Sequence, residues 1–280
     1  MRFVTDNATA SPAVVDGPVW AVVLAGGASR RFGSRSKQFE EAGGLRLVDR
    51  TVAAARRTCD AVVLVLPAGV IWDGDPVEAV AVGGDHQSES LRSGLEKVPG
   101  DAAIIVVADA AHPLASDRLF RDVIDAVRRG ADGAVPVVPL LEIVQRVDED
   151  GRVIDTLPKD GLVITQSPHA FRASVLRTVH RDRPRPVENS SLLVERGYRV
   201  VTVPGEAANL HVTTPEELDV VRKLACVEQV EQHVPNHAPQ LVGTGHSAPR
   251  ADRTHRKEAV PDAPGHAGCH SVRRPGHPHS

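Results

Sequence analysis

Residues 19–38 read VWAVVLAGGASRRFGSRSKQ and join an apolar segment to a loop rich in glycine and positive charge. Ala25, Gly26 and Gly27 follow the apolar segment, and glycine lets backbone N–H groups approach a ligand closely. The loop then carries four cations, Arg30, Arg31, Arg35 and Lys37. Such a surface can neutralise the phosphates of a nucleoside triphosphate. The alternative is a tight turn with solvated side chains, since the loop has neither GxxxxGK[ST] nor GxGxxG with its acidic residue.

Two later segments carry further polar groups at the ends of apolar runs. Gly84 and Asp85 follow the run that ends at Val82, Ser90 lies in the helical pattern after them, and Asp109 ends the run IIVVAD. Gly84, Asp85 and Asp109 belong at the same edge of the predicted sheet as the basic loop, which favours a phosphate site there. The alternatives are a turn residue for Asp85, a solvent-facing position for Ser90 and a helix cap for Asp109.

The elements that must position these groups alternate along the chain. Short apolar runs rich in Val and Ile predict strands buried on both faces, at 19–24, 61–66, 80–82, 102–107, 133–138 and 198–203. Helical patterns lie between them at 47–57, 87–98 and 116–129, and Thr214-Pro215-Glu216-Glu217 predicts the start of a last helix. The pattern predicts an α/β fold with a doubly wound, mostly parallel sheet. Ligands of such sheets bind beyond the carboxyl ends of the strands, where the three segments should meet.

Residues 139–165 interrupt this alternation. Two short extended runs flank Asp150-Gly151, which predicts a β-hairpin arm. A hairpin has too little core of its own, so we expect it to pack against a second subunit.

Composition limits the organisation and the partners. A formal net charge of −3 argues against nucleic-acid binding. The sequence contains no run of about 18 apolar residues, so no membrane span is predicted. The three cysteines show no disulfide or metal-ligand spacing, which favours a cytoplasmic protein. We expect a disordered extension at 1–17, a domain at 18–226 and a disordered tail at 227–280. The tail holds eight of the 13 histidines; a metal-binding tract is the alternative, but their spacing is not consistent.

Seven pieces of the chain resemble one known family in order and spacing. They are AVVLAGGASRRFGSRSKQ, VGGDHQSESLRSGL, VVADAAHPL, VQRVDEDGRV, ITQSPHAF, ENSSLLVERGYRVVTVPG and NLHVTTPEEL. Together they are similar to the 2-C-methyl-D-erythritol 4-phosphate cytidylyltransferases of non-mevalonate isoprenoid biosynthesis. The basic loop alone also resembles molybdopterin nucleotidyltransferases, but the match through Asn209 to Leu218 favours the isoprenoid-type family.

This resemblance implies a Rossmann-like nucleotidyltransferase that dimerises through the arm. It implies attack of a polyol phosphate on the α-phosphorus of CTP, with Mg²⁺ as cofactor and pyrophosphate as leaving group. Ala25, Gly26 and Gly27 would hold the nucleotide, Arg31 and Lys37 would neutralise its phosphates, and Asp109 would bind Mg²⁺ and the ribose side. Gly84, Asp85 and Ser90 would contact the cytosine and ribose.

The chain departs from the family pattern in the half that should hold the acceptor substrate. His112 stands for an arginine, His211 for a lysine, Glu142 for an aspartate and Lys159 for an arginine. Histidine is mostly neutral at pH 7, so cationic groups are lost there. Three hypotheses follow: a methylerythritol phosphate enzyme, a cytidylyltransferase for another phosphorylated or phosphonylated alcohol, or a homologue that binds nucleotide without turnover.

Overall fold

The computed structural model describes residues 14–27, 32 and 36–233. Its strands are β1 (Val19–Leu24), β2 (Glu41–Ala42), β3 (Leu45–Arg46), β4 (Ala61–Leu66), β5 (Ala79–Val82), β6 (Ile104–Asp109), β7 (Gly133–Pro139), β8 (Gln145–Val147), β9 (Val153–Thr156), β10 (Val163–Thr165), β11 (His169–Arg172) and β12 (Val200–Pro204). Its helices are the 3-10 helix η2 (Lys37–Phe39), α1 (Leu47–Thr58), α2 (Gln87–Leu95), α3 (Asp117–Arg128), α4 (Ala173–Val179), α5 (Asn189–Glu195) and α6 (Pro215–His233). None of the helices in these ranges is both long enough and apolar enough to cross a membrane.

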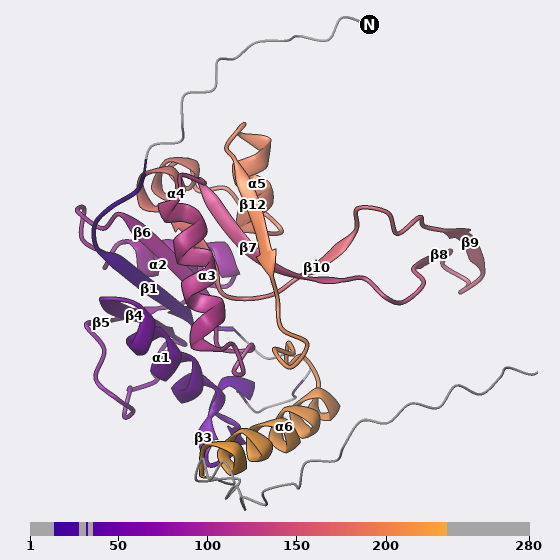
Figure 1. The fold of residues 1–280 in the computed structure, drawn as a ribbon, viewed down its shortest axis with the longest axis horizontal. Coiled ribbons are helices and arrows are strands. Elements are labelled where there is room, and N and C mark those ends of the chain that lie inside the picture. The colour runs from indigo at the N-terminus through magenta and orange to yellow at the C-terminus, as the bar shows by residue number, and fades with distance from the viewer. Residues whose placement is uncertain (1–13, 28–31, 33–35, 234–280) are drawn as a thin grey trace, which may run out of the picture. The chain divides into compact units, whose positions relative to one another are not determined.

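One mixed sheet organises the chain (Figure 1), and its strand order is β10-β7-β11-β6-β1-β4-β5, with β12 also paired to β7. Strands β6, β1, β4 and β5 run parallel, as does the pair β12 and β7. Strand β11 runs antiparallel to β6 and β7. The predicted α/β class with a mostly parallel sheet is confirmed. Sequence analysis missed β11 because its four residues, HAFR, form no apolar run.

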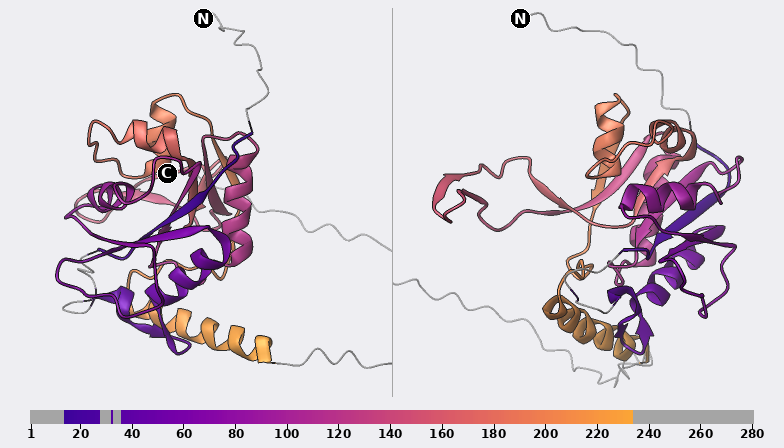
Figure 2. Two further views of the ribbon diagram at one scale, coloured as in Figure 1. Left: turned by 90° about the vertical axis from the view of Figure 1, so that its left-hand side faces the viewer. Right: turned by 180° about the vertical axis from the view of Figure 1, so that it is seen from behind.

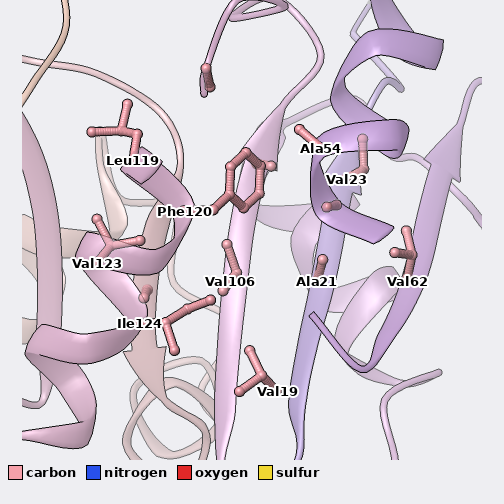
Figure 3. Packing of buried hydrophobic residues seen from close by; sticks show 14 of the residues in the cluster. Val19, Ala21, Val23, Ala54, Val62, Val106, Leu119, Phe120, Val123 and Ile124 are labelled. Carbon is pink, nitrogen blue, oxygen red and sulfur yellow. The ribbon is translucent and has the colours of Figure 1, made fainter. Parts of the chain in front are cut away.

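Helices cover both faces of the sheet because its central strands are apolar on both sides. Val19, Ala21 and Val23 of β1 pack in a cluster with α1 and α3, and Figure 3 shows Phe120 of α3 beside Val106 on this face. The other face of the same strands packs against α2, α4 and α5. The sheet is therefore held rigidly from two sides, which fixes the edge where its parallel strands end.

Helix α6 packs at that end of the sheet, against the β2–β3 hairpin (Figure 1). Its predicted capping box is present: the Glu217 N–H donates to Thr214 Oγ1 at 3.3 Å, and the Thr214 N–H donates to Glu217 Oε2 at 2.9 Å. Arg222 donates to the Glu41 carbonyl at 3.0 Å and pairs with Glu40 at 3.1 Å. These contacts fix the start of α6 and anchor the helix to the residues at the β2–β3 hairpin.

Two predicted boundaries are wrong. Val15, assigned to the N-terminal extension, is buried, and its N–H donates to the Arg128 carbonyl at 3.0 Å. Helix α6 continues past Cys226 to His233, so the first residues of the predicted tail are helical. The rest of the two predicted disordered segments, 1–13 and 234–280, lies outside the described residues.

The segment between β7 and β10 forms a long hairpin rooted in the central sheet. Strand β10 pairs antiparallel with β7, and β8 pairs antiparallel with β9 across the Asp150-Gly151 turn. Figure 2 shows β8 and β9 away from the sheet. Apolar side chains on this segment are exposed, among them Ile143 at 70% and Ile154 at 59%.

Candidate functional site

Glycines from two loops meet at the carboxyl ends of β1 and β5. The Ala25 N–H donates to the Val65 carbonyl at 2.9 Å, and the Gly83 N–H donates to the Leu66 carbonyl at 2.8 Å, so β4 draws both loops together. A Cβ on Gly26 would lie 3.2 Å from the Gly83 Cα and 3.5 Å from Ser90 Oγ. We call Gly26, Gly83, Gly84 and Ser90 the glycine cradle. The backbones of its glycines can approach each other and a ligand closely because glycine has no side chain.

Ser90 positions this cradle and does not face solvent. Its side chain is buried, and its hydroxyl accepts a hydrogen bond from the Gly84 N–H at 3.1 Å. The alternative of a solvent-facing serine is therefore wrong. Asp85, beside Gly84, is exposed, and Gly27 has open space where a Cβ would stand.

Asp109 is the last residue of β6 and is tied to the loop that follows. Its Oδ1 accepts from the Ala111 N–H at 2.8 Å, and its own N–H donates to Ser167 Oγ at 2.8 Å. Helix α3 is capped instead by Ser116, whose hydroxyl accepts from the Leu119 N–H. The alternative that Asp109 caps the next helix is therefore wrong, and its carboxylate is directed by the loop after the strand.

Two histidines stack beside Asp109. The rings of His112 and His211 have centroids 4.6 Å apart and planes only 6° from parallel. His211 Nε2 lies 4.0 Å from Asp109 Oδ2. Burial lowers the pKa of His112 to about 3, and the nearby His211, His169 and Lys37 act in the same direction. His112 is therefore a neutral imidazole at pH 7.

Lys37 reaches the same place from the other end of the chain. Its Nζ donates to the Val212 carbonyl at 2.7 Å, and the Val212 N–H donates to the Ala111 carbonyl at 2.8 Å. One short stretch of backbone thus joins Lys37 to the loop after Asp109. The second proposed cation, Arg31, lies outside the described residues.

A cavity of about 190 Å³ opens between these groups and the amino end of β11. Polar residues from five segments of the chain line it, among them Asp109, His112, Ser167, His169, Glu188 and His211. Because β11 runs antiparallel, its first residues lie at the same edge as the last residues of β6. The cavity therefore opens at the edge where β1 and β6 end, and of the described residues predicted to bind the nucleotide, Asp109 alone lines it.

Sequence reasoning missed Ser167 and His169 as members of this site. His169 Nδ1 lies 3.3 Å from Glu188 Oε1. Burial opposes ionisation of Glu188, but hydrogen bonds from His169 and from backbone N–H groups outweigh it and hold the pKa of Glu188 below its usual value. The available sign in the sequence was the string SPH at the start of β11. It could be placed at this edge only if β11 had been predicted to run antiparallel to β6.

The amide of Asn209 holds the two walls of the cavity together. The side-chain Nδ2 of Asn209 donates to the Ser167 carbonyl at 2.7 Å. The backbone carbonyl of Asn209 accepts from Gln166 Nε2 at 3.0 Å. Both amides are buried. This network fixes the segment that carries His211 against the segment that carries Ser167.

Two predicted acceptor-site residues lie elsewhere. Glu142 and Lys159 are exposed on the hairpin between β7 and β10, and Lys159 Nζ donates to the Leu141 carbonyl at 2.7 Å. Neither lines the cavity of its own chain. The other two, His112 and His211, do.

Known proteins share this sequence pattern. A family model described as 2-C-methyl-D-erythritol 4-phosphate cytidylyltransferase (IspD) matches residues 19–225. The protein of that name from Rhodococcus jostii is 34% identical over 221 residues, which cover 76% of this chain and 96% of the relative. The one from Frankia casuarinae is 35% identical over 215 residues, covering 74% of this chain and 80% of the relative.

A longer relative and a solved structure complete the comparison. The bifunctional enzyme IspD/IspF of Granulibacter bethesdensis is 34% identical over 247 residues, covering 85% of this chain but only 61% of the relative's length. The crystal structure of 2-C-methyl-D-erythritol 4-phosphate cytidylyltransferase from Thermus thermophilus aligns with a TM-score of 0.64 and 26% identity, over 73% of this chain and 97% of that one. The chain therefore belongs to the 2-C-methyl-D-erythritol 4-phosphate cytidylyltransferase family of nucleotidyltransferases.

Proposed function

We propose that this protein transfers CMP from CTP to 2-C-methyl-D-erythritol 4-phosphate and releases pyrophosphate. The observation that carries the proposal is the meeting of the glycine cradle, Lys37 and Asp109 at one edge of the sheet. A triphosphate needs close backbone N–H groups, a cation and an acidic metal ligand together, because phosphoryl chemistry depends on positioning and charge. The family named above supplies the substrates.

In this proposal an acceptor phosphate oxygen attacks the α-phosphorus of CTP. The new P–O bond forms as the bond to the β-phosphate breaks, and pyrophosphate carries away the bonding electrons. Ala25, Gly26 and Gly27 would bind the nucleotide through their backbones, while Gly84, Asp85 and Ser90 border the cytosine and ribose. Lys37 and Arg31 would neutralise charge that grows on the phosphate oxygens in the transition state.

Mg²⁺ is the proposed cofactor, and Asp109 is its proposed protein ligand. Mg²⁺ prefers oxygen ligands and retains several waters. Asp109 offers Oδ2, but the neighbouring donors on His112 and His211 are nitrogens. Phosphate oxygens and waters would therefore complete the coordination, and Mg²⁺ would supply charge neutralisation of the triphosphate.

A homodimer is the proposed assembly. The hairpin between β7 and β10 exposes apolar side chains, including Ile143 and Ile154, that its own chain does not cover. A second copy would cover them. The double variant Ile143→Asp, Ile154→Asp should sediment as a monomer, and a dimer of unchanged stability would refute this assembly.

Cys59 and Cys226 are free thiols, which supports a cytoplasmic location.

A different acceptor is a second candidate, because His112 and His211 stand where the family pattern has an arginine and a lysine. Among the described residues that line the cavity, none is Lys or Arg. An acceptor phosphate or phosphonate attached to another small alcohol would then be the substrate. The CTP half of the proposal is the same in both cases.

Pyrophosphate release separates these possibilities. The full chain should release pyrophosphate with CTP, Mg²⁺ and methylerythritol phosphate, and less with ATP, GTP or UTP. Turnover only with another phosphorylated alcohol would favour the second candidate, while CTP binding without turnover would leave a non-catalytic homologue. Asp109→Asn should lower the rate on the order of 10²-fold or more. Asp101→Asn, an exposed aspartate before β6, is the matched control and should not.

A further inference from the structure

Three possible metal ligands converge in the cavity. One donor atom each from Asp109, His112 and His211 lies within 4.8 Å of the others. Two of these residues lie at the end of β6 and in the loop after it, where the His112 N–H donates to the Asp109 carbonyl at 2.9 Å. The third arrives on the segment before α6, held by the bond between Val212 and Ala111. Backbone contacts therefore assemble this triad.

Hydrogen bonds at Asp109 and His112 leave potential ligand atoms unused. Asp109 Oδ1 accepts from Ala111, whereas Oδ2 faces His211. His112 is buried, and its Nδ1 makes no hydrogen bond to any residue the structure describes. A buried imidazole nitrogen without a partner is costly, and metal-ligating histidines are usually oriented by contacts to the surrounding protein. The triad is a built arrangement, and it carries a polar group that protein contacts do not use.

We propose that Asp109, His112 and His211 bind one divalent transition-metal ion of the Zn²⁺ or Co²⁺ class. Imidazole nitrogen suits these ions and suits Mg²⁺ poorly. In a tetrahedral site with metal bonds of about 2.0–2.2 Å the ligand atoms lie about 3.3–3.6 Å apart, so the triad must close by about 1.2–1.5 Å around an ion. The half-exposed His211 ring must also turn out of its stack with His112. Three protein ligands leave at least one position for water or substrate, as in catalytic metal sites.

The ion would change the charge of the acceptor half of the cavity. With both imidazoles in the neutral form that binds a metal, the cluster carries the one negative charge of the carboxylate, which repels phosphate. A divalent ion makes the same cluster net positive, with an open position that a phosphate oxygen can take. Because Asp109 Oδ2 would serve both ions, this ion takes the place proposed for Mg²⁺ at Asp109 whenever it is bound. The effect on the acceptor rests on the proposed function; the metal binding itself does not.

Cobalt titration of the full chain, freed of metal with a chelator, tests the proposal without nucleotide. The tail contributes histidines of its own, so the comparison is between variants and not against a blank. The wild type should bind one tight equivalent of Co²⁺ with a visible d–d absorption band, which Zn²⁺ displaces and millimolar Mg²⁺ does not. His211→Gln and His112→Gln should each weaken that equivalent at least tenfold.

The control is His246→Gln, a tail histidine, which should leave the band and the affinity unchanged. Because His211 is half-exposed, His211→Gln should fold, and circular dichroism can check this. His211→Gln therefore decides the outcome even if His112→Gln does not fold. Identical Co²⁺ binding by the wild type and His211→Gln would overturn the proposal, as would loss of the band in His246→Gln alone. Nucleotidyl transfer with Mg²⁺ is measured separately, so failure of either claim is visible without the other.

Discussion

The buried neutral imidazole of His112 should make the protein less stable in mild acid. The pKa of His112 is about 3 in the folded chain, with burial as the main cause, against about 6.5 in an unfolded chain. Between these two values the unfolded state binds more protons than the folded state, so the free energy of unfolding falls as pH falls. Above about pH 6.5 the effect vanishes because the imidazole is neutral in both states.

The size of the effect follows from the two pKa values. Linkage gives a loss of about 2 kcal/mol on going from pH 7 to pH 5 for this one group. That is a large part of the roughly 5–15 kcal/mol that typically holds a domain folded. His112→Gln removes the titration while keeping a polar side chain of similar reach.

Urea unfolding at pH 7 and pH 5, with chelator present, measures the loss in both proteins. Other titrating groups contribute to each, so the informative quantity is the difference between the two pH dependences. The wild type should lose about 2 kcal/mol more than His112→Gln over this interval. Equal losses would mean that His112 titrates near its usual pKa, and the burial argument would be refuted.

Three further predictions concern catalysis and packing. Lys37→Met should lower kcat for pyrophosphate release on the order of 10²–10³-fold, whereas Lys97→Met, an exposed lysine after α2, should not; equal rates would remove Lys37 from the site. Gly26→Ala should lower the free energy of unfolding by about 1 kcal/mol, because its Cβ presses on Gly83. Gly27→Ala meets no atom within 4 Å, so its thermal unfolding should match the wild type, and a matching loss would contradict the cradle geometry. Phe120→Ala should cost about 3–5 kcal/mol in chemical denaturation, and a loss below about 1 kcal/mol would contradict its burial.

Much of the fold could be predicted because burial leaves a pattern in neighbouring residues. Strands β1 and β4 have the predicted bounds, 19–24 and 61–66, since both are buried along almost their whole length. Helix α3 was predicted from its single apolar face. Parallel strands then end at one edge, which brought Gly26, Gly84 and Asp109 together in the prediction.

The path of irregular segments could not be predicted in the same way. Residues 205–214 have no apolar period, yet they carry His211 to Asp109 and present the carbonyl that Lys37 binds. Strand β11 is too short to leave a pattern, and its reversed direction puts Ser167 and His169 in the cavity. Such placements depend on single hydrogen bonds between distant residues, such as Asn209 to Ser167.

The sequence by itself determined the parallel part of the sheet, its two covered faces and the edge at which we expect a nucleotide to bind. Only the tertiary structure decided that His112 and His211 stack beside one carboxylate and that the hairpin residues Glu142 and Lys159 lie outside the cavity. The physical reason is the separation along the chain between the residues that interact. Periodicity records what each residue buries locally, whereas the chemistry of the cavity depends on which loops the packed elements bring into contact.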